Sequence, residues 1–232
     1  MKTLIILLLS LGLIQVSYGH ALWIQTQPQS EINQPHEVKI FYGEFETQEF
    51  DTVDKWYSDV KDFKLYLTLP NGEKTELQKT AEKDCFIATF TPAEEGVYAL
   101  HIAHPTEEMY EGKRFDFSST ALVSIGKTSV IPNIESPFFV RTGSNTLKVG
   151  QPVEAIVFVD QKPAENIEVM IIRADGWIKT VKTDQQGKIS FSADWKGDYM
   201  LEASQTVEKK DQWNGIPMNS IWRGATTLIQ II

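Results

Sequence analysis

The sequence predicts an all-β protein made of two β-sandwich units. Short apolar runs recur between turn-forming residues, and no segment shows the 3.6-residue apolar period of a long helix. Residues 63–69 alternate between apolar and other side chains, as expected of a half-buried strand. The pairs Asn71-Gly72 and Asp175-Gly176 favour tight hairpin turns. Strands spaced by about 8–12 residues are typical of sandwiches.

The first unit is expected over residues 20–126. Its predicted strands cover residues 38–42, 63–69, 86–90, 96–102 and 115–125. Residues 44–62 interrupt this pattern, because acidic side chains there are interleaved with aromatic ones. Two interpretations are open for this acidic insertion: a solvated loop anchored by its aromatic residues, or a cation site built from carboxylates. Its spacing does not match an EF-hand loop, so calcium has no specific support.

A connector is expected over residues 127–146, where Pro132, Pro137 and Gly143 break regular structure. The second unit follows over residues 147–232. Its predicted strands cover residues 153–159, 167–172, 177–181, 188–191, 197–203 and 221–232.

Both units contain the pattern Gly-x-Tyr-x-Leu before a strand, at residues 96–100 and 197–201. This is the tyrosine placement of immunoglobulin-like (Ig-like) sandwiches, which predicts a role at the edge of each core. The repeated pattern suggests an internal duplication. We therefore expect two Ig-like or carboxypeptidase-regulatory-like sandwiches.

Residues 1–19 have the layout of a cleaved secretion signal. Lys2 precedes an apolar run over residues 4–16, and the small residues Ser17 and Gly19 stand where a signal peptidase reads. An uncleaved membrane anchor is the rival interpretation, but about 13 residues are too few to span about 30 Å of hydrocarbon. We expect cleavage after Gly19, no transmembrane segment afterwards, and a location in the periplasm or outside the cell.

Composition excludes several classes of function. The chain has a formal net charge of −9, which argues against nucleic-acid binding through a basic patch. Cys85 is the single cysteine, so neither an internal disulfide nor a multi-thiolate metal site can form. Because Cys85 lies in a strand-like run, we expect a buried, inert thiol.

Histidine chemistry supplies the candidate site. A mature chain that begins at His20 carries an α-amino nitrogen and an imidazole on one residue, and these two groups can chelate one divalent transition metal ion. Further ligands are expected from His101 or His104, with a carboxylate such as Glu44 in addition. Strand alternation places His101 on the face opposite Leu100 and Ile102. Both histidines also fit ordinary surface or hydrogen-bonded positions, and His36 is expected in an exposed loop.

Three segments carry a resemblance to a known family. They are His20-Ala21-Leu22-Trp23-Ile24, then Pro35-His36-Glu37-Val38 leading to Phe41-Tyr42-Gly43, and a set of second-unit motifs that starts at Val149-Gly150-Gln151-Pro152-Val153 and ends at Gly197-Asp198-Tyr199.

The sequence resembles the DUF4198 family, exported bacterial proteins described as periplasmic components of cobalt or nickel uptake systems. The resemblance implies a non-enzymatic protein that binds Ni or Co, with Cu as a further option, and that has a membrane metal transporter as its partner. Family members often carry extra histidines late in the chain, whereas residues 211–232 contain none.

Two other functions remain open. The first is an Ig-like carbohydrate-binding, peptide-binding or adhesion module without metal, since six tryptophans could line a groove. The second is an oxidative copper enzyme with an N-terminal histidine brace, which needs a second histidine at the same metal. Metal content after purification with a native N-terminus distinguishes these functions.

Overall fold

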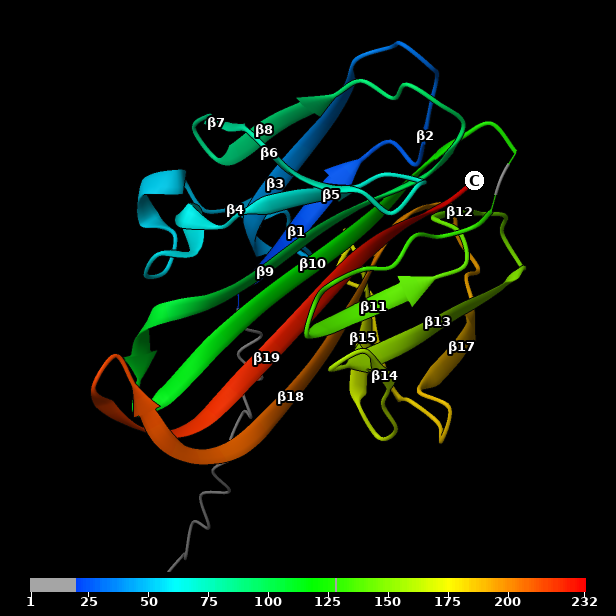
Figure 1. Cartoon of the computed structure of the whole chain (residues 1–232). Coiled ribbons are helices and arrows are strands. Elements are labelled where there is room, and N and C mark those ends of the chain that lie inside the picture. Colours follow the sequence, from blue (N-terminus) through cyan, green and yellow to red (C-terminus); the bar gives the residue numbers. More distant parts are fainter. Residues whose placement is uncertain (1–19, 128) are drawn as a thin grey trace, which may run out of the picture.

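The computed structural model describes residues 20–127 and 129–232, and the predicted signal segment, residues 1–19, lies outside this range. The expectation of an all-β fold is confirmed. The described strands form three sheets (Figure 1), and two short 3-10 turns, η1 (Val53–Lys55) and η2 (Val60–Asp62), lie between β4 and β5. Within these residues, no helix is long and apolar enough to cross a membrane.

The largest sheet runs through both halves of the chain. Its main path contains, in spatial order, β16 (Ile178–Lys182), β15 (Glu168–Arg173), β18 (Gly197–Trp213), β19 (Ile216–Ile231), β10 (Lys113–Ile125), β9 (Gly96–Tyr110), β5 (Leu65–Thr68) and β6 (Lys74–Leu77). Two short strands join it, β2 (Gln29–Ser30) on β10 and β12 (Thr146–Leu147) on β19. The long strands β9, β10, β19 and β18 lie side by side in Figure 1. Because β10 pairs in parallel with β19, the two halves share one continuous sheet.

Two smaller sheets complete the fold. The five-stranded sheet contains β1 (Ala21–Thr26), β3 (His36–Glu44), β4 (Glu49–Phe50), β7 (Lys79–Ala81) and β8 (Cys85–Phe90). The four-stranded sheet contains β11 (Phe138–Thr142), β13 (Pro152–Val159), β14 (Lys162–Pro163) and β17 (Lys188–Ser192). Strand β11 lies inside the segment expected as a connector. It pairs with β13 because Phe138 and Val140 pack into the core of the second half.

Backbone groups of β1 form hydrogen bonds with side chains of the large sheet. The Ile24 amide donates to the Ser119 hydroxyl at 3.0 Å, and the Thr226 hydroxyl donates to the Leu22 carbonyl at 2.7 Å. These bonds satisfy polar groups of a buried strand. Since side chains alternate along β1, Leu22 and Ile24 enter one apolar core and Trp23 enters another.

Both tyrosines of the repeated pattern bond to the backbone four residues upstream. The Tyr98 hydroxyl donates to the Glu94 carbonyl at 3.1 Å, and the Tyr199 hydroxyl donates to the Trp195 carbonyl at 3.0 Å. Both side chains are buried in their cores. The expected core-edge role of the two tyrosines is therefore confirmed.

The acidic insertion is held down by buried aromatic residues. Phe45 and Trp56 are each only 4% exposed, and the Trp56 ring stacks on Phe63 at 6.2 Å. These contacts agree with the loop interpretation, although the insertion also directs carboxylates toward His20, as described below. Cys85 is buried as expected, and burial raises the pKa of its thiol.

Candidate functional site

The His20 ring lies between two carboxylates. Its Nδ1 is 3.4 Å from Glu44 Oε1, and its Nε2 is 3.2 Å from Asp51 Oδ2. Pairing of β1 with β3 brings Ala21 opposite Gly43, so the next pair along the strands is His20 and Glu44. The His20 side chain is 41% exposed. The structure therefore joins the predicted pair His20 and Glu44 and adds Asp51, which sequence reasoning missed.

An aromatic cavity opens beside this histidine. Its volume is about 570 Å³. The lining residues are His20, Tyr42, Asp51, Lys55, Tyr57, Tyr110, Phe115, Phe117 and Trp222. The Tyr42 ring is 5.3 Å from the His20 ring and 5.6 Å from the Phe117 ring. Burial, followed by the charge of Asp51, raises the pKa of the Tyr42 phenol, so this hydroxyl stays protonated at neutral pH.

Three glutamates gather near the start of β1. Burial, followed by the neighbouring Glu46 carboxylate, raises the pKa of Glu44. Glu202 on β18 is 6% exposed. Burial, followed by the charges of Glu46 and Glu44, raises its pKa to about 8. Such a concentration of negative charge is costly without a cation.

Sequence reasoning missed Glu202, although the sequence contained a signal for it. Glu202 stands in the otherwise apolar run Tyr199-Met200-Leu201-Glu202-Ala203. A charged residue in a buried strand needs a partner. The acidic neighbours Glu44 and Glu46 cannot be read from spacing, because they lie about 150 residues earlier in the sequence.

His101 and His104 point to opposite faces of the large sheet. His101 is opposite Thr120, whose hydroxyl donates to the Val140 carbonyl on β11, whereas His104 is opposite Phe117, which packs beside Tyr42. The expected placement of His101 away from Leu100 and Ile102 is confirmed. Because His20 lies on the Tyr42 side, His101 is not brought to the candidate site.

The two histidines named as further ligands have other neighbours in the structure. His101 is 1% exposed and stacks on Tyr66 at 5.4 Å. Burial, followed by the charge of Lys74, lowers its pKa to about 4. His104 Nε2 lies 3.2 Å from Asp59 Oδ2. Across residues 20–127 and 129–232, no three His, Cys, Asp or Glu side chains are already arranged to hold a metal ion.

His36 lines a second, polar cavity. The expectation of an exposed loop position is wrong, since His36 begins β3 and is 6% exposed. Its Nε2 is 2.7 Å from the Thr26 hydroxyl, and its ring lies 5.1 Å from Phe90. Burial lowers the pKa of the ring. His36 is therefore a structural residue of this groove.

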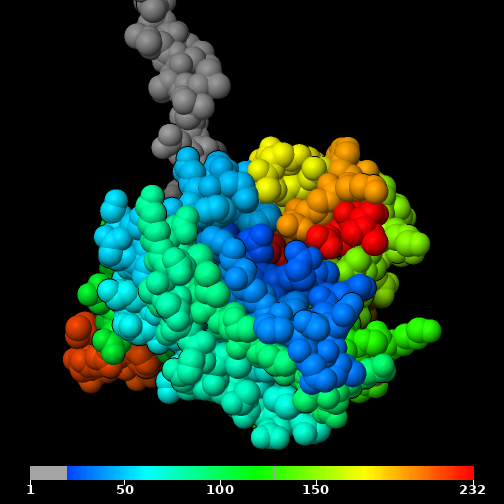
Figure 2. All heavy atoms as spheres, turned by 90° about the horizontal axis from the view of Figure 1, so that it is seen from above, coloured from blue at the N-terminus to red at the C-terminus, as the bar shows by residue number. Residues whose placement is uncertain are grey.

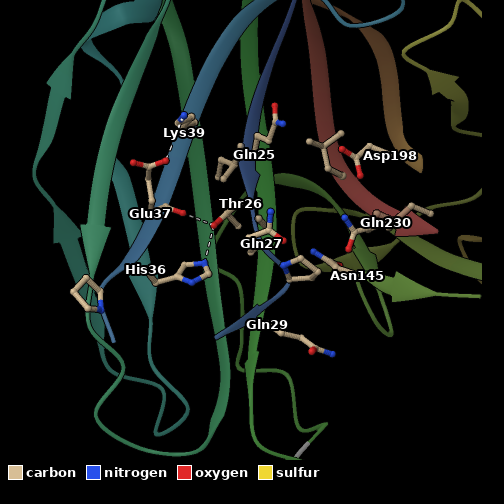
Figure 3. Close-up of a pocket in the computed structure, with 16 residues that line it drawn as sticks. Gln25, Thr26, Gln27, Gln29, His36, Glu37, Lys39, Asn145, Asp198 and Gln230 are labelled. Atoms are coloured by element: carbon tan, nitrogen blue, oxygen red, sulfur yellow. Dashed lines mark hydrogen bonds and ion pairs between the residues drawn. The ribbon is translucent and has the colours of Figure 1, made fainter. Parts of the chain in front are cut away.

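The polar groove has a volume of about 390 Å³ and lies between the two halves of the chain. Figure 2 shows this region between the blue residues of the N-terminal strands and the red end of β19. In Figure 3, Gln25, Thr26 and His36 face Asp198 and Gln230 across it. Amide and carboxyl groups on both walls could hydrogen-bond a polar, uncharged ligand.

The model of a family described as a domain of unknown function (DUF4198) matches residues 137–207. The predicted resemblance to DUF4198 is thereby confirmed over this part of the chain. The matched segment contains Glu202, whereas His20, Glu44 and Asp51 lie before it. No curated protein matches the sequence.

Proposed function

We propose that this protein binds a divalent transition metal ion, Ni or Co or else Cu, outside the cytoplasm through a mature N-terminal His20. The observation that carries the proposal is the position of the His20 ring, with Glu44 beside Nδ1 and Asp51 beside Nε2. The metal is the cargo, and a membrane metal transporter is the proposed partner. Imidazole is a good ligand for all three ions.

The arrangement assigns a different role to each group. The α-amino nitrogen and Nδ1 of His20 close a chelate ring around the ion, and Glu44 supplies an oxygen ligand from the same side. Asp51 lies 3.2 Å from the opposite ring nitrogen, where its charge favours the tautomer that leaves Nδ1 free for metal. This assignment replaces the two histidines that the sequence suggested as further ligands.

The same geometry favours a binding protein over an oxidative copper enzyme. A histidine brace needs a second imidazole at the metal. His101 faces the other side of the sheet, and His104 is paired with Asp59. Nitrogen and oxygen donors on the surface suit reversible capture and release.

Titration of Ni or Cu into the processed protein tests the role of Glu44. We expect Glu44→Gln to raise the dissociation constant by about tenfold or more, since it removes a charged oxygen ligand. Asp62→Asn is the matched control, because Asp62 belongs to the same acidic insertion and is exposed. Equal affinities for the two variants would remove Glu44 from the site.

The aromatic cavity supports a second candidate function. Tyr42, Tyr57, Tyr110 and Trp222 line it beside Asp51, and stacking aromatic rings with a hydrogen-bonding group suit a sugar. A change in tryptophan fluorescence on adding oligosaccharides, lost in Trp222→Ala and unaffected by chelators, would favour a carbohydrate-binding module. Fluorescence that responds only to metal would favour the first proposal.

A further inference from the structure

The free edge of β1 forms one wall of the polar groove. Strand β1 is the outermost strand of its sheet, and it lies against β10 and β19 of the large sheet. Backbone N–H and C=O groups of alternate strand residues point to the same edge. The Ile24 amide points to the large sheet, where it donates to the Ser119 hydroxyl. The backbone groups of Thr26 therefore have the same direction, and Thr26 lies where the groove opens.

The opposite wall of the polar groove belongs to the large sheet. Asp198 on β18 is paired with Gln230 on β19, and both side chains face β1 across the groove in Figure 3. Asn145 joins this wall, and its carbonyl accepts the Gln230 amide at 2.7 Å. The apolar side chains of Ala121 and Leu228 also line the groove. The groove thus has a strand edge on one side and polar side chains on the other.

Uncharged amide groups are the commonest polar groups in this lining. Gln25, Gln27 and Gln29 come from the segment that contains β1 and β2. Gln230 and Asn145 belong to the opposite wall. A carboxamide carries both a donor and an acceptor, which is the same pair that a peptide unit offers. These five side chains therefore match the hydrogen-bonding groups of a peptide backbone.

The polar groove has little net charge. Lys39 Nζ lies 3.4 Å from Glu37 Oε1, so these two charges offset each other. Burial lowers the pKa of His36, which keeps its ring neutral at neutral pH. Asp198 is the remaining acidic group among the described lining residues. This composition favours an uncharged ligand.

The lining also favours a peptide over a sugar. Among the described residues that line the polar groove there is no Phe, Tyr or Trp, in contrast to the aromatic cavity beside His20. Sugar sites gain much of their affinity from stacking on aromatic rings. An extended peptide needs no such ring, because main-chain hydrogen bonds to a strand edge provide its affinity.

We propose that the polar groove binds a short, extended and uncharged peptide segment, which pairs with the β1 edge at Thr26 while the carboxamide side chains bind its other backbone groups. Addition of a peptide to an exposed strand edge is a recurrent mode of recognition. Residues 24–29 all line the groove, and a tetrapeptide, about 13 Å long when extended, is short enough to lie beside them. This site is separate from His20 and requires no metal.

Nuclear magnetic resonance titration of the isotope-labelled processed protein tests this proposal, with a chelator present throughout. The probe is an equal mixture of N-acetylated, C-amidated tetrapeptides made of Ala, Ser, Asn and Gln. We expect it to shift the backbone amide signal of Thr26 and the side-chain amide signals of Gln25 and Gln230, with a dissociation constant of about 1 mM or below. The same peptides with N-methylated backbones should bind at least about tenfold more weakly, because they cannot donate to β1.

Gln25→Ala gives a second measurement. Gln25 is exposed on β1, so its truncation leaves the apolar cores unchanged. We expect it to weaken peptide binding by about fivefold, since it removes one hydrogen-bonding amide. Gln185→Ala is the matched control, because Gln185 is an exposed glutamine between β16 and β17, outside the groove. Its affinity for the peptides should stay within about twofold of the wild type.

Three results would overturn the proposal. They are the absence of shifts at about 10 mM peptide, equal binding of the N-methylated peptides, and equal affinities of the two variants. Cello-oligosaccharides should leave the Thr26 and Gln230 signals unchanged. Shifts caused by the sugars and not by the peptides would assign the groove to carbohydrate and would also overturn the proposal. Because a chelator is present, these results are independent of whether the protein binds Ni, Co or Cu.

Discussion

His20 and His101 lie on opposite faces of the same fold, in opposite surroundings. His20 is 41% exposed, touches two carboxylates and borders an aromatic cavity. His101 belongs to β9, is 1% exposed and stacks on Tyr66. One imidazole is available to a ligand, whereas the other is held as a neutral core group. The comparison shows that exposure and neighbouring side chains decide whether a histidine is a candidate metal ligand.

The largest expected effect concerns His101 and acid stability. Its pKa is lowered from 6.5 to about 4 in the folded protein by burial, then by Lys74, while Glu135 acts in the opposite direction. The unfolded chain therefore takes up a proton first. The stability that neutral His101 contributes is complete above about pH 6.5 and is lost as the pH falls toward 4. The loss amounts to about 3 kcal/mol at most.

Urea unfolding at pH 7 and pH 4.5 measures this loss. His101→Phe keeps a ring against Tyr66 but cannot titrate, so it should flatten the fall in unfolding free energy between the two pH values. Ile102→Val is the control, because it changes a buried neighbour on the same strand without removing a titratable group, and it should keep the slope of the wild type. An unchanged slope in His101→Phe would mean that other groups govern acid unfolding.

A smaller effect is expected at the pair His104 and Asp59. Asp59 accepts the Glu107 amide at 2.8 Å and the Ser58 hydroxyl at 2.9 Å. Burial acts to raise its pKa, but these hydrogen bonds and His104 bring it below the usual value. Asp59→Asn should lower the unfolding free energy by about 1 kcal/mol, and Ni or Cu affinity should stay within about twofold. A tenfold loss of affinity would return His104 to the metal site.

Local sequence patterns were sufficient for much of the fold. Alternation at residues 63–69, the hairpin turns and the paired tyrosines predicted strands and core edges, because these depend on near neighbours. The continuous sheet depends on the parallel pairing of β10 with β19, whose residues are more than 100 positions apart. Local patterns contain no information on such a pairing.

The candidate site was predictable only where one residue carried the chemistry. His20 stood out because a histidine at the mature N-terminus can chelate a metal ion with its α-amino nitrogen and its imidazole. Glu44 was named as a further ligand. Asp51 was missed because it reaches His20 through the path of a loop. Glu202 was missed because its acidic neighbours, Glu44 and Glu46, are distant in the sequence. The expectation for His36 failed because a preceding proline suggested a loop, whereas β3 begins at that residue.

The central claim is that the amine and imidazole of His20 bind metal together. Calorimetric titration of Ni and Cu into three processed proteins tests it most directly: the native His20 start, His20→Ala, and a chain with one glycine left before His20. The added glycine keeps the imidazole but displaces the free amine.

We predict the tightest binding for the native start and a loss of about 100-fold or more in His20→Ala. The glycine-extended chain should fall in between, and native affinity should decrease below neutral pH as the amine, with a pKa of about 8, holds its proton. Equal binding by all three proteins would contradict the claim and favour a metal-free binding module.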